Sequence, residues 1–219
     1  MAPEELLLRR AVVCGSGLLY WAGVIIQARR IRKQIGHSPN VKPRGAKEKV
    51  LWLGWFLVIL VWIGQPLMLG ATTTTLGLKL LTILLHPAGL VIGLAMVILG
   101  YAGTLWTYAT MGNNWRMGVN AKERTALVCS GPFHWVRHPI YLLQMVMLTG
   151  AALLLPTPLS FAILVLHYVC ARLKAWDEER YLENVHGRAY RQYSSRTGGL
   201  FPRLIGRGTA ANNESPEGI

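Results

Sequence analysis

The segment Arg137-His138-Pro139-Ile140-Tyr141 begins the part of the chain that decides the fold. The stretch after it, Leu142 to Leu173, carries one Arg and no acid, and Pro156-Thr157-Pro158 divides it into two arms. Lys174 and Asp177-Glu178-Glu179 follow the second arm. Short apolar arms joined by a proline turn predict a helical hairpin in a membrane, with a proline tolerated at each helix start. Such a hairpin would return the acidic residues to the Arg-His pair at one membrane surface.

Three further apolar runs precede the hairpin. Ala11 to Ala28, Val50 to Ala71 and Pro87 to Thr107 contain 18, 22 and 21 residues without a charged side chain. At 1.5 Å per helical residue, each run reaches or nearly reaches across about 30 Å of hydrocarbon. No Ala-x-Ala-like cleavage site follows the first run, which indicates a retained helix and not a signal peptide. The sequence therefore predicts an all-α polytopic membrane protein with about five transmembrane helices, the last two forming the hairpin.

The net charge of +13 is unevenly distributed. Segments 29–49, 106–138 and 172–207 hold eight, four and eight Lys or Arg residues, together 20 of the 23. Five crossings place these segments on one side, which the positive-inside rule makes cytoplasmic. We expect the N-terminus outside and the C-terminus in the cytoplasm, in a bacterial inner membrane or the endoplasmic reticulum. Orientation and contact with anionic membrane lipids explain the charge better than nucleic acid, since no nucleic-acid-reading motif accompanies it.

The cysteines carry no metal or disulfide signature. Cys14 and Cys170 lie in apolar runs, and Cys129 lies on the predicted cytoplasmic side. No Cys-x-x-Cys or Cys/His ligand spacing occurs, so we expect neither a metal site nor a disulfide.

The connections between the runs carry weaker signals. Thr72 to Thr75 reads as an external turn, and Leu76 to His86 either lies along the interface or extends the next helix, since Pro87 permits a helix start or a kink. Beyond Arg180 we expect a soluble helix to about Tyr193. Within the third run, Gly89, Gly93 and Gly100 share one face, which favours close helix packing over room for a lipid chain.

Polar residues at the end of the hairpin share a helix face. His167, Ala171, Lys174 and Glu178 are spaced by four, three and four residues, so they align if the second arm continues out of the membrane. In the simplest interpretation Lys174 extends to the surface and pairs with Glu178, while His167 packs. The adjacent carboxylates of Glu178 and Glu179 repel each other. The presence of such a pair is easier to understand if it binds a cation.

The Arg-His segment offers complementary chemistry. Arg137 presents a planar fork for a carboxylate, and His138 is a donor or acceptor near neutral pH. Tyr141 follows about one helical turn later and projects to a similar side. In a simpler interpretation, Arg137 only contributes to the positive charge that orients the protein in the membrane, and His138 only caps a helix. Together with Glu178, these groups suit a zwitterionic cofactor beside an apolar substrate.

The composite pattern resembles the isoprenylcysteine carboxyl methyltransferase family, which is related to the membrane phospholipid methyltransferases. The similarity covers about residues 101–203 and rests on the Arg-His-Pro-x-Tyr segment, the charge-poor hairpin, the Glu-Glu pair, Gly112-Asn113-Asn114-Trp115, Leu182, Gly187, Tyr190, Tyr193 and Thr197-Gly198-Gly199-Leu200-Phe201-Pro202. It implies an integral membrane methyltransferase that uses S-adenosylmethionine, with a cytoplasmic cofactor-binding region under a lipid-accessible cavity. We expect N-terminal transmembrane helices over 1–105, a catalytic region over 106–205 and a disordered tail over 206–219.

The resemblance also implies site residues. The family's cofactor contacts fall on Gly118, Thr125, Ala126, Leu127, Val128, Phe133, His138, Pro139, Ile140, Tyr141 and Glu178. A substrate-positioning Arg of the family falls on Lys174, which keeps the charge but loses the bidentate fork. Phe133 replaces a frequent Tyr and Thr125 a frequent His, and bulky Leu143 stands where a small residue is common.

Methyl transfer from a sulfonium is an in-line displacement, in which the protein mainly aligns donor and acceptor. Glu178 suits the cofactor's amino group, and Arg137 or backbone N–H groups at a helix start suit its carboxylate. Rings of Phe133, Trp135 or Tyr141 can face the sulfonium.

The implied catalytic set is Arg137, His138, Lys174 and Glu179. An ionised carboxylate or thiolate acceptor needs no general base, whereas an amine does, and His138 or Glu179 is a candidate. We expect an amphipathic substrate reached from the bilayer, with a prenylated cysteine carboxylate first and a phospholipid (ethanolamine) amine second.

Two other classes remain open. NADPH-dependent sterol-type reductases carry a similar Arg-His-Pro-x-Tyr segment usually followed by Gly-Glu, whereas Leu142-Leu143-Gln144 follows here. A non-enzymatic membrane scaffold or transporter would explain the helices without a site, but the chain shows no paired halves. Binding of NADPH, or of no cofactor, would favour these alternatives.

Overall fold

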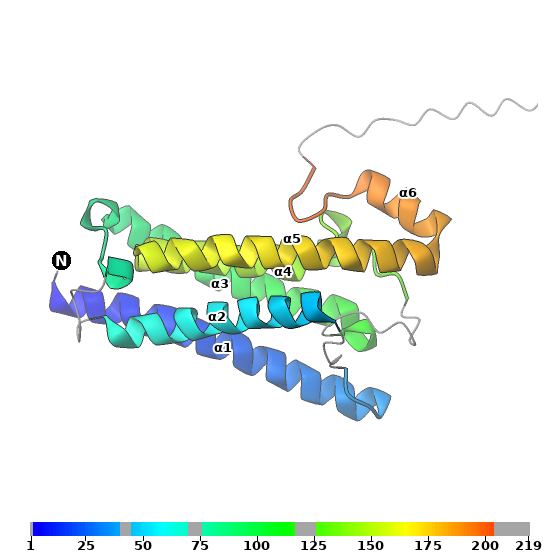
Figure 1. Cartoon of the computed structure of the whole chain (residues 1–219), viewed down its shortest axis with the longest axis horizontal. Coiled ribbons are helices and arrows are strands. Elements are labelled where there is room, and N and C mark those ends of the chain that lie inside the picture. Colours follow the sequence, from blue (N-terminus) through cyan, green and yellow to red (C-terminus); the bar gives the residue numbers. More distant parts are fainter. Residues whose placement is uncertain (1, 40–44, 70–75, 117–125, 204–219) are drawn as a thin grey trace, which may run out of the picture.

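The computed structural model describes residues 2–39, 45–69, 76–116 and 126–203, and the long helices run along a common axis (Figure 1). Five long helices form the bundle, namely α1 (Pro3–Ile35), α2 (Ala46–Met68), α3 (Pro87–Met111), α4 (Pro139–Leu154) and α5 (Pro158–His186). The short helix α6 (Arg188–Arg196) folds against the end of α5. Short 3-10 turns are η1 (Leu76–Leu78), η2 (Thr82–Leu84), η3 (Gly112–Asn114) and η4 (Gly131–His134).

The bundle has the surface of a membrane protein. Within the described residues, α1, α2, α3 and α5 are long and apolar enough to cross a membrane, and α4 is a shorter apolar helix. Leu19, Leu60 and Leu99 are 60%, 55% and 67% exposed on the outside of the bundle. Helices that are apolar on their outer as well as their inner faces are typical of membrane spans. The predicted all-α polytopic membrane fold is confirmed.

Helix α1 is longer than the uncharged run predicted. It spans Pro3–Ile35, not Ala11 to Ala28, because Arg9 is accommodated inside the bundle at 1% exposure. The guanidinium of Arg9 donates to Glu5 Oε1 at 2.8 Å and to the carbonyl of Leu154 at 3.1 Å. A charge neutralised in this way does not end the helix.

The soluble helix expected from beyond Arg180 to about Tyr193 is divided between α5 and α6. The second arm does not give way to a separate helix at Arg180, because α5 continues to His186 and ends at Gly187, whose φ is +53°. No proline or glycine interrupts the chain between Leu173 and His186, so the helix has no reason to end sooner. Of the two alternatives for Leu76 to His86, the extension of α3 does not occur, since the segment forms the turns η1 and η2. The predictions for 72–75 and 206–219 lie outside the described residues.

The glycine face of α3 packs against α4, as the sequence predicted. A Cβ atom added at Gly93 would lie 2.8 Å from the carbonyl oxygen of Gly150, and one at Gly100 would lie 2.9 Å from that of Leu143. Only glycine lets the two helix backbones approach so closely. This contact fixes α4 against the centre of the bundle.

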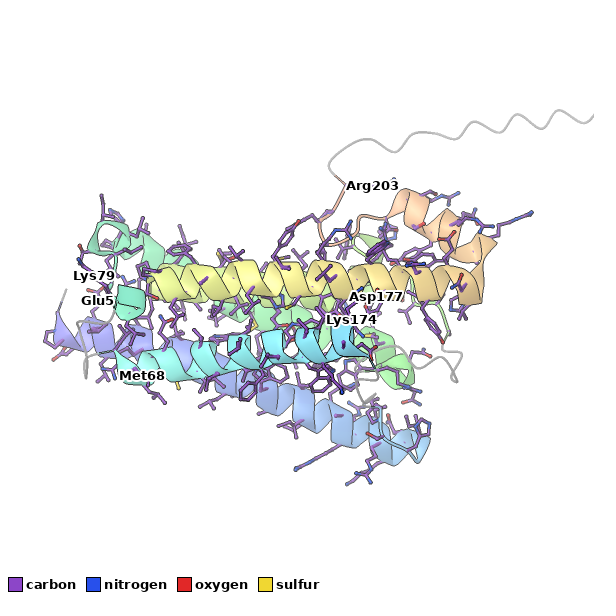
Figure 2. All side chains as sticks on the ribbon, in the orientation of Figure 1. Glu5, Met68, Lys79, Lys174, Asp177 and Arg203 are labelled. Atoms are coloured by element: carbon purple, nitrogen blue, oxygen red, sulfur yellow. The ribbon has the colours of Figure 1, made fainter. Side chains whose placement is uncertain are left out.

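The hairpin of α4 and α5 determines where the polar groups lie. At its closed end the Gln65 side-chain amide donates to the hydroxyls of Thr157 and Ser160, each at 2.9 Å. Figure 2 shows Glu5 and Lys79 at this end of the bundle and Lys174 and Asp177 toward the other. The open end, where α4 begins and α5 leaves the bundle, therefore lies opposite the start of the chain.

Candidate functional site

The open end of the hairpin brings an imidazole between two carboxylates. His138 precedes the first residue of α4, while Glu178 and Glu179 lie on α5. Nδ1 of His138 is 3.3 Å from Glu178 Oε2, and Nε2 is 3.1 Å from Glu179 Oε1. The hydroxyl of Tyr141 donates to Glu178 Oε1 at 2.9 Å. The expected meeting of the two polar clusters is confirmed.

Arg137 is held on several sides. Its Nε and Nη2 donate to Glu179 Oε1 at 3.0 and 2.9 Å, and its Nη1 donates to the carbonyls of Ser194 and Thr197 at 3.2 and 2.6 Å. The backbone N–H of Arg137 also donates to the Gly198 carbonyl at 2.8 Å. Arg137 therefore ties α4, α5 and the segment after α6 together, and its fork has little capacity left for a ligand.

The electrostatics of His138 follow from these contacts. Burial of the imidazole, which is part of a residue 6% exposed, lowers its pKa. The hydrogen bonds and charges of Glu178 and Glu179 act in the opposite direction and prevail, so the pKa of His138 is raised. When it is protonated, the ring can donate to both carboxylates and hold them in place.

A cavity of about 310 Å³ opens beside this cluster. Its walls are mainly apolar and aromatic and come from every long helix, including Tyr20, Trp21 and Val24 of α1, Trp52, Trp55 and Phe56 of α2, Tyr108 and Met111 of α3, Tyr141 and Gln144 of α4, and Lys174 and Glu178 of α5. Trp55 stacks on Tyr141 with ring centroids 6.0 Å apart, and Tyr141 stacks on His138 at 5.8 Å. An apolar chamber with a few polar groups at one end suits an amphipathic ligand.

Most of the expected site residues meet at this cavity. Its lining includes Phe133, Arg137, His138, Pro139, Ile140, Tyr141, Lys174 and Glu178. Lys174 and Glu178 lie one helical turn apart, yet in the described part of the chain no ion pair joins them. The simple pairing expected for Lys174 is absent there, and Lys174 is one of the residues that line the cavity.

Other expected residues lie elsewhere. Ala126, Leu127 and Val128 are not part of the cavity lining, and the N–H of Ala126 donates to Asn114 Oδ1 at 3.3 Å. Glu179 lies behind His138, outside the lining. Trp135 packs edge-on to Trp106 at 5.8 Å, away from the lining. Gly118 and Thr125 lie outside the described residues.

The sequence reasoning missed the contribution of the first two helices. Tyr20 and Trp21 of α1 and Trp52 and Trp55 of α2 line the cavity beside the hairpin residues. Trp52, Trp55 and Phe56 are spaced as neighbours on one helix face, which is a signal for an aromatic wall. That spacing alone does not reveal which helix the wall faces.

Comparison with known proteins gives a consistent assignment. A model of the isoprenylcysteine carboxyl methyltransferase family matches residues 91–184, which include Arg137, His138, Lys174 and both acids. The nickel-cobalt-cadmium resistance protein NccN of Alcaligenes xylosoxydans xylosoxydans is 29% identical over 52% of this chain and 53% of its own length. Protein-S-isoprenylcysteine O-methyltransferase B of Arabidopsis thaliana is 30% identical over 48% of this chain and 54% of its own length.

The chain thus spans about half the length of the curated relatives it matches. The matched region contains the whole of α4 and most of α3 and α5, so it coincides with the hairpin and the helix packed on it. Over residues 91–184, the chain is similar to the isoprenylcysteine carboxyl methyltransferase family.

Proposed function

We propose that the chain is an integral membrane methyltransferase that uses S-adenosylmethionine and methylates an amphipathic substrate reached from the bilayer. The observation that carries the proposal is the shared cavity of Lys174, Glu178, His138 and Tyr141, with opposite charges at one end of an apolar chamber. The family match supports the reaction class. The site would face the cytoplasm, with the N-terminus outside, in a bacterial inner membrane or the endoplasmic reticulum.

The residues at the cavity fit the chemistry of the cofactor. Glu178 lines the cavity with a carboxylate for an amino group, and its orientation is fixed by His138 and Tyr141. Arg137 is already occupied by Glu179 and two carbonyls, so the first turn of α4, whose N–H groups lack intrahelical partners, is the better place for a carboxylate. The aromatic rings of Trp55 and Tyr141 line the cavity and would provide cation–π contact for a sulfonium.

The bound cofactor would supply an electrophilic methyl group, and the chain's residues would align the acceptor with it. Lys174 lines the cavity one turn before Glu178 and suits the carboxylate of the substrate. Apolar walls from α1 and α2 suit its hydrocarbon part. Because this cavity uses α1 and α2 as well as the hairpin, the proposed catalytic region of 106–205 acts together with both.

The surroundings of His138 bear on which group of the substrate accepts the methyl group, because an amine would need a general base. Both ring nitrogens of His138 face carboxylates of α5, so neither is directed at an acceptor in the cavity, and His138 is a poor general base. Glu179 is covered by Arg137 and His138, outside the cavity lining. An acceptor that is already ionised needs neither residue as a base. This favours a prenylated cysteine carboxylate over a phospholipid amine.

Cofactor binding by the purified full chain tests the proposal. We expect S-adenosylmethionine to bind, measured by equilibrium dialysis with labelled cofactor, and Glu178→Gln to abolish the binding. Glu183→Gln is the matched control, because Glu183 is on the same helix in an exposed pair with Arg191 at 3.5 Å. Unchanged affinity in Glu178→Gln would refute the site, as would binding of NADPH in place of S-adenosylmethionine.

A labelled-methyl assay tests the substrate. Wild-type protein would be offered total membrane lipid, a prenylcysteine analogue and small thiols in parallel. We expect label in the prenylcysteine analogue as a base-labile methyl ester. Label in phospholipid amines would shift the acceptor to our second choice, and no transfer to any acceptor class would contradict the proposed activity.

A further inference from the structure

Two hydrogen-bond donors in the wall of the cavity have no acceptor. Gln144 is 4% exposed, and its Oε1 accepts from the Tyr20 hydroxyl at 3.3 Å. Its amide nitrogen Nε2 is buried and has no partner in the described part of the chain, and the same holds for the indole nitrogen of Trp21. Both residues line the cavity.

Gln144 occupies a defined level of the chamber, and Trp21 is the chain neighbour of Tyr20, whose hydroxyl donates to Gln144. Gln144 follows Tyr141 by three residues, so it lies about 4.5 Å further along α4, away from the charged end. Trp21 approaches from α1, next to Tyr20, whose ring contacts the Trp21 ring at 5.6 Å. Tyr20 and Trp21 lie outside the matched region 91–184, so the family match says nothing of them.

A buried donor without an acceptor is costly, because it has given up its hydrogen bonds to water. A plain hydrocarbon chain cannot satisfy either donor. An oxygen acceptor can, and the terminal amide torsion of glutamine is broad enough to turn Nε2 toward it. Neither Gln144 nor Trp21 carries a charge, and a buried ion without a countercharge is costly, so these donors suit a neutral oxygen better than an anion.

We propose that Gln144 and Trp21 form a specificity site for a neutral oxygen acceptor, a carbonyl or ether, carried by the substrate about one helical turn below its reacting head. The inference rests on the proposed function only in taking this cavity as the place of the substrate. It refines the class of substrate, since amphiphiles with such an oxygen would bind more tightly than those, such as a prenylcysteine, whose tail is pure hydrocarbon.

Equilibrium binding without any methyl donor tests the site. The probes are 3-(alkylthio)propionates of equal chain length, one unsubstituted and the others with a single ketone at successive carbons. We expect the wild-type chain, in detergent, to bind one ketone isomer about tenfold more tightly than the unsubstituted probe. In Gln144→Met, which keeps the volume and removes the donor, most of that preference should disappear.

The affinities of the ketone probes and the unsubstituted probe are compared within the same variant. Gln144→Met also removes the acceptor of the Tyr20 hydroxyl, and this loss affects all probes equally. Trp21→Phe should also reduce the preference, since it removes only the N–H. Thr149→Val is the matched control and should keep it, because Thr149 is on the same helix and its hydroxyl donates to the Met145 carbonyl, outside the cavity lining.

Equal binding of all probes by the wild-type chain would overturn the inference, because water would then satisfy the donors as well as any ligand. A preference that survives in both Gln144→Met and Trp21→Phe would overturn it too. A clear preference in a chain that never transfers methyl groups would instead count against the proposed function alone.

Discussion

Nδ1 of His138 lies 3.3 Å from Oε2 of Glu178, although a complete helical hairpin separates the two residues in the chain. The contact depends on arms that pack side by side, so that the end of one meets the start of the other. Gly93 and Gly150 hold the first arm against α3 at the bundle centre. Glu178 and Glu179 are therefore presented by a rigid helix and His138 lies directly before another, which fixes their geometry more firmly than a long loop would.

The charge of His138 predicts a pH-dependent stability. Its folded-state pKa is raised by Glu178 and Glu179, with Arg137 and Tyr141 as the other groups in the cluster. A raised pKa stabilises the fold fully below the unfolded value of about 6.5, and this stabilisation is lost as pH rises through the folded pKa. We expect the unfolding temperature in detergent to fall over that window. His138→Asn should abolish that slope, and parallel profiles for the two proteins would contradict the assignment.

Arg137 should be essential for the segment after α6. Arg137→Lys keeps a charge but cannot reach Glu179, Ser194 and Thr197 together, so we expect a loss of about 2 kcal/mol in the free energy of unfolding. Limited proteolysis should cut earlier within 194–203. The control is Arg191→Lys, whose side chain is 63% exposed and pairs with Glu183 at 3.5 Å, and whose effect should be below about 0.5 kcal/mol. Similar losses for both variants would show that Arg137 is not a structural tie.

The contact of α3 with α4 should not tolerate a methyl group. A Cβ at Gly150 would lie 2.6 Å from the Gly93 carbonyl oxygen, and neither helix backbone can move away cheaply. We expect Gly150→Ala to destabilise the bundle by about 1–3 kcal/mol in thermal unfolding. Gly64→Ala in α2 meets nothing within 4 Å and should be neutral or slightly stabilising. Equal stability of Gly150→Ala and Gly64→Ala would mean that the close approach is not required.

The hairpin and its polar ends could be predicted because their signals are local. An apolar run of the right length, a proline turn and flanking charges specify two helices and their direction, and pairing then brings His138 to Glu178. The extent of α1 could not be predicted this way. Arg9 reads as a helix boundary in a hydropathy pattern, yet its neutralisation by Glu5 and two carbonyls of another helix is a tertiary event.

The residues that line the cavity could likewise be predicted only in part. Residues of the Arg-His segment were expected at the site because a family pattern places them there, whereas Tyr20 and Trp55 belong to helices without such a pattern. Stacking of Trp55 on Tyr141 depends on how α2 packs between α1 and α5. Helix packing of this kind involves residues far apart in sequence, which periodicity within one helix does not encode.

Lys174 provides the sharpest test of the acceptor. Lys174 lines the cavity, and we assign its ammonium to the carboxylate of the substrate and not to that of the cofactor. Lys174→Met should lower kcat/KM for a prenylcysteine carboxylate about tenfold or more, through KM, since a charge-assisted hydrogen bond is lost. Affinity for S-adenosylmethionine should stay unchanged, and Lys174→Arg should retain most of the activity because it keeps the cation. A fall in cofactor affinity with an unaltered KM would move the lysine to the cofactor's carboxylate and reverse this assignment.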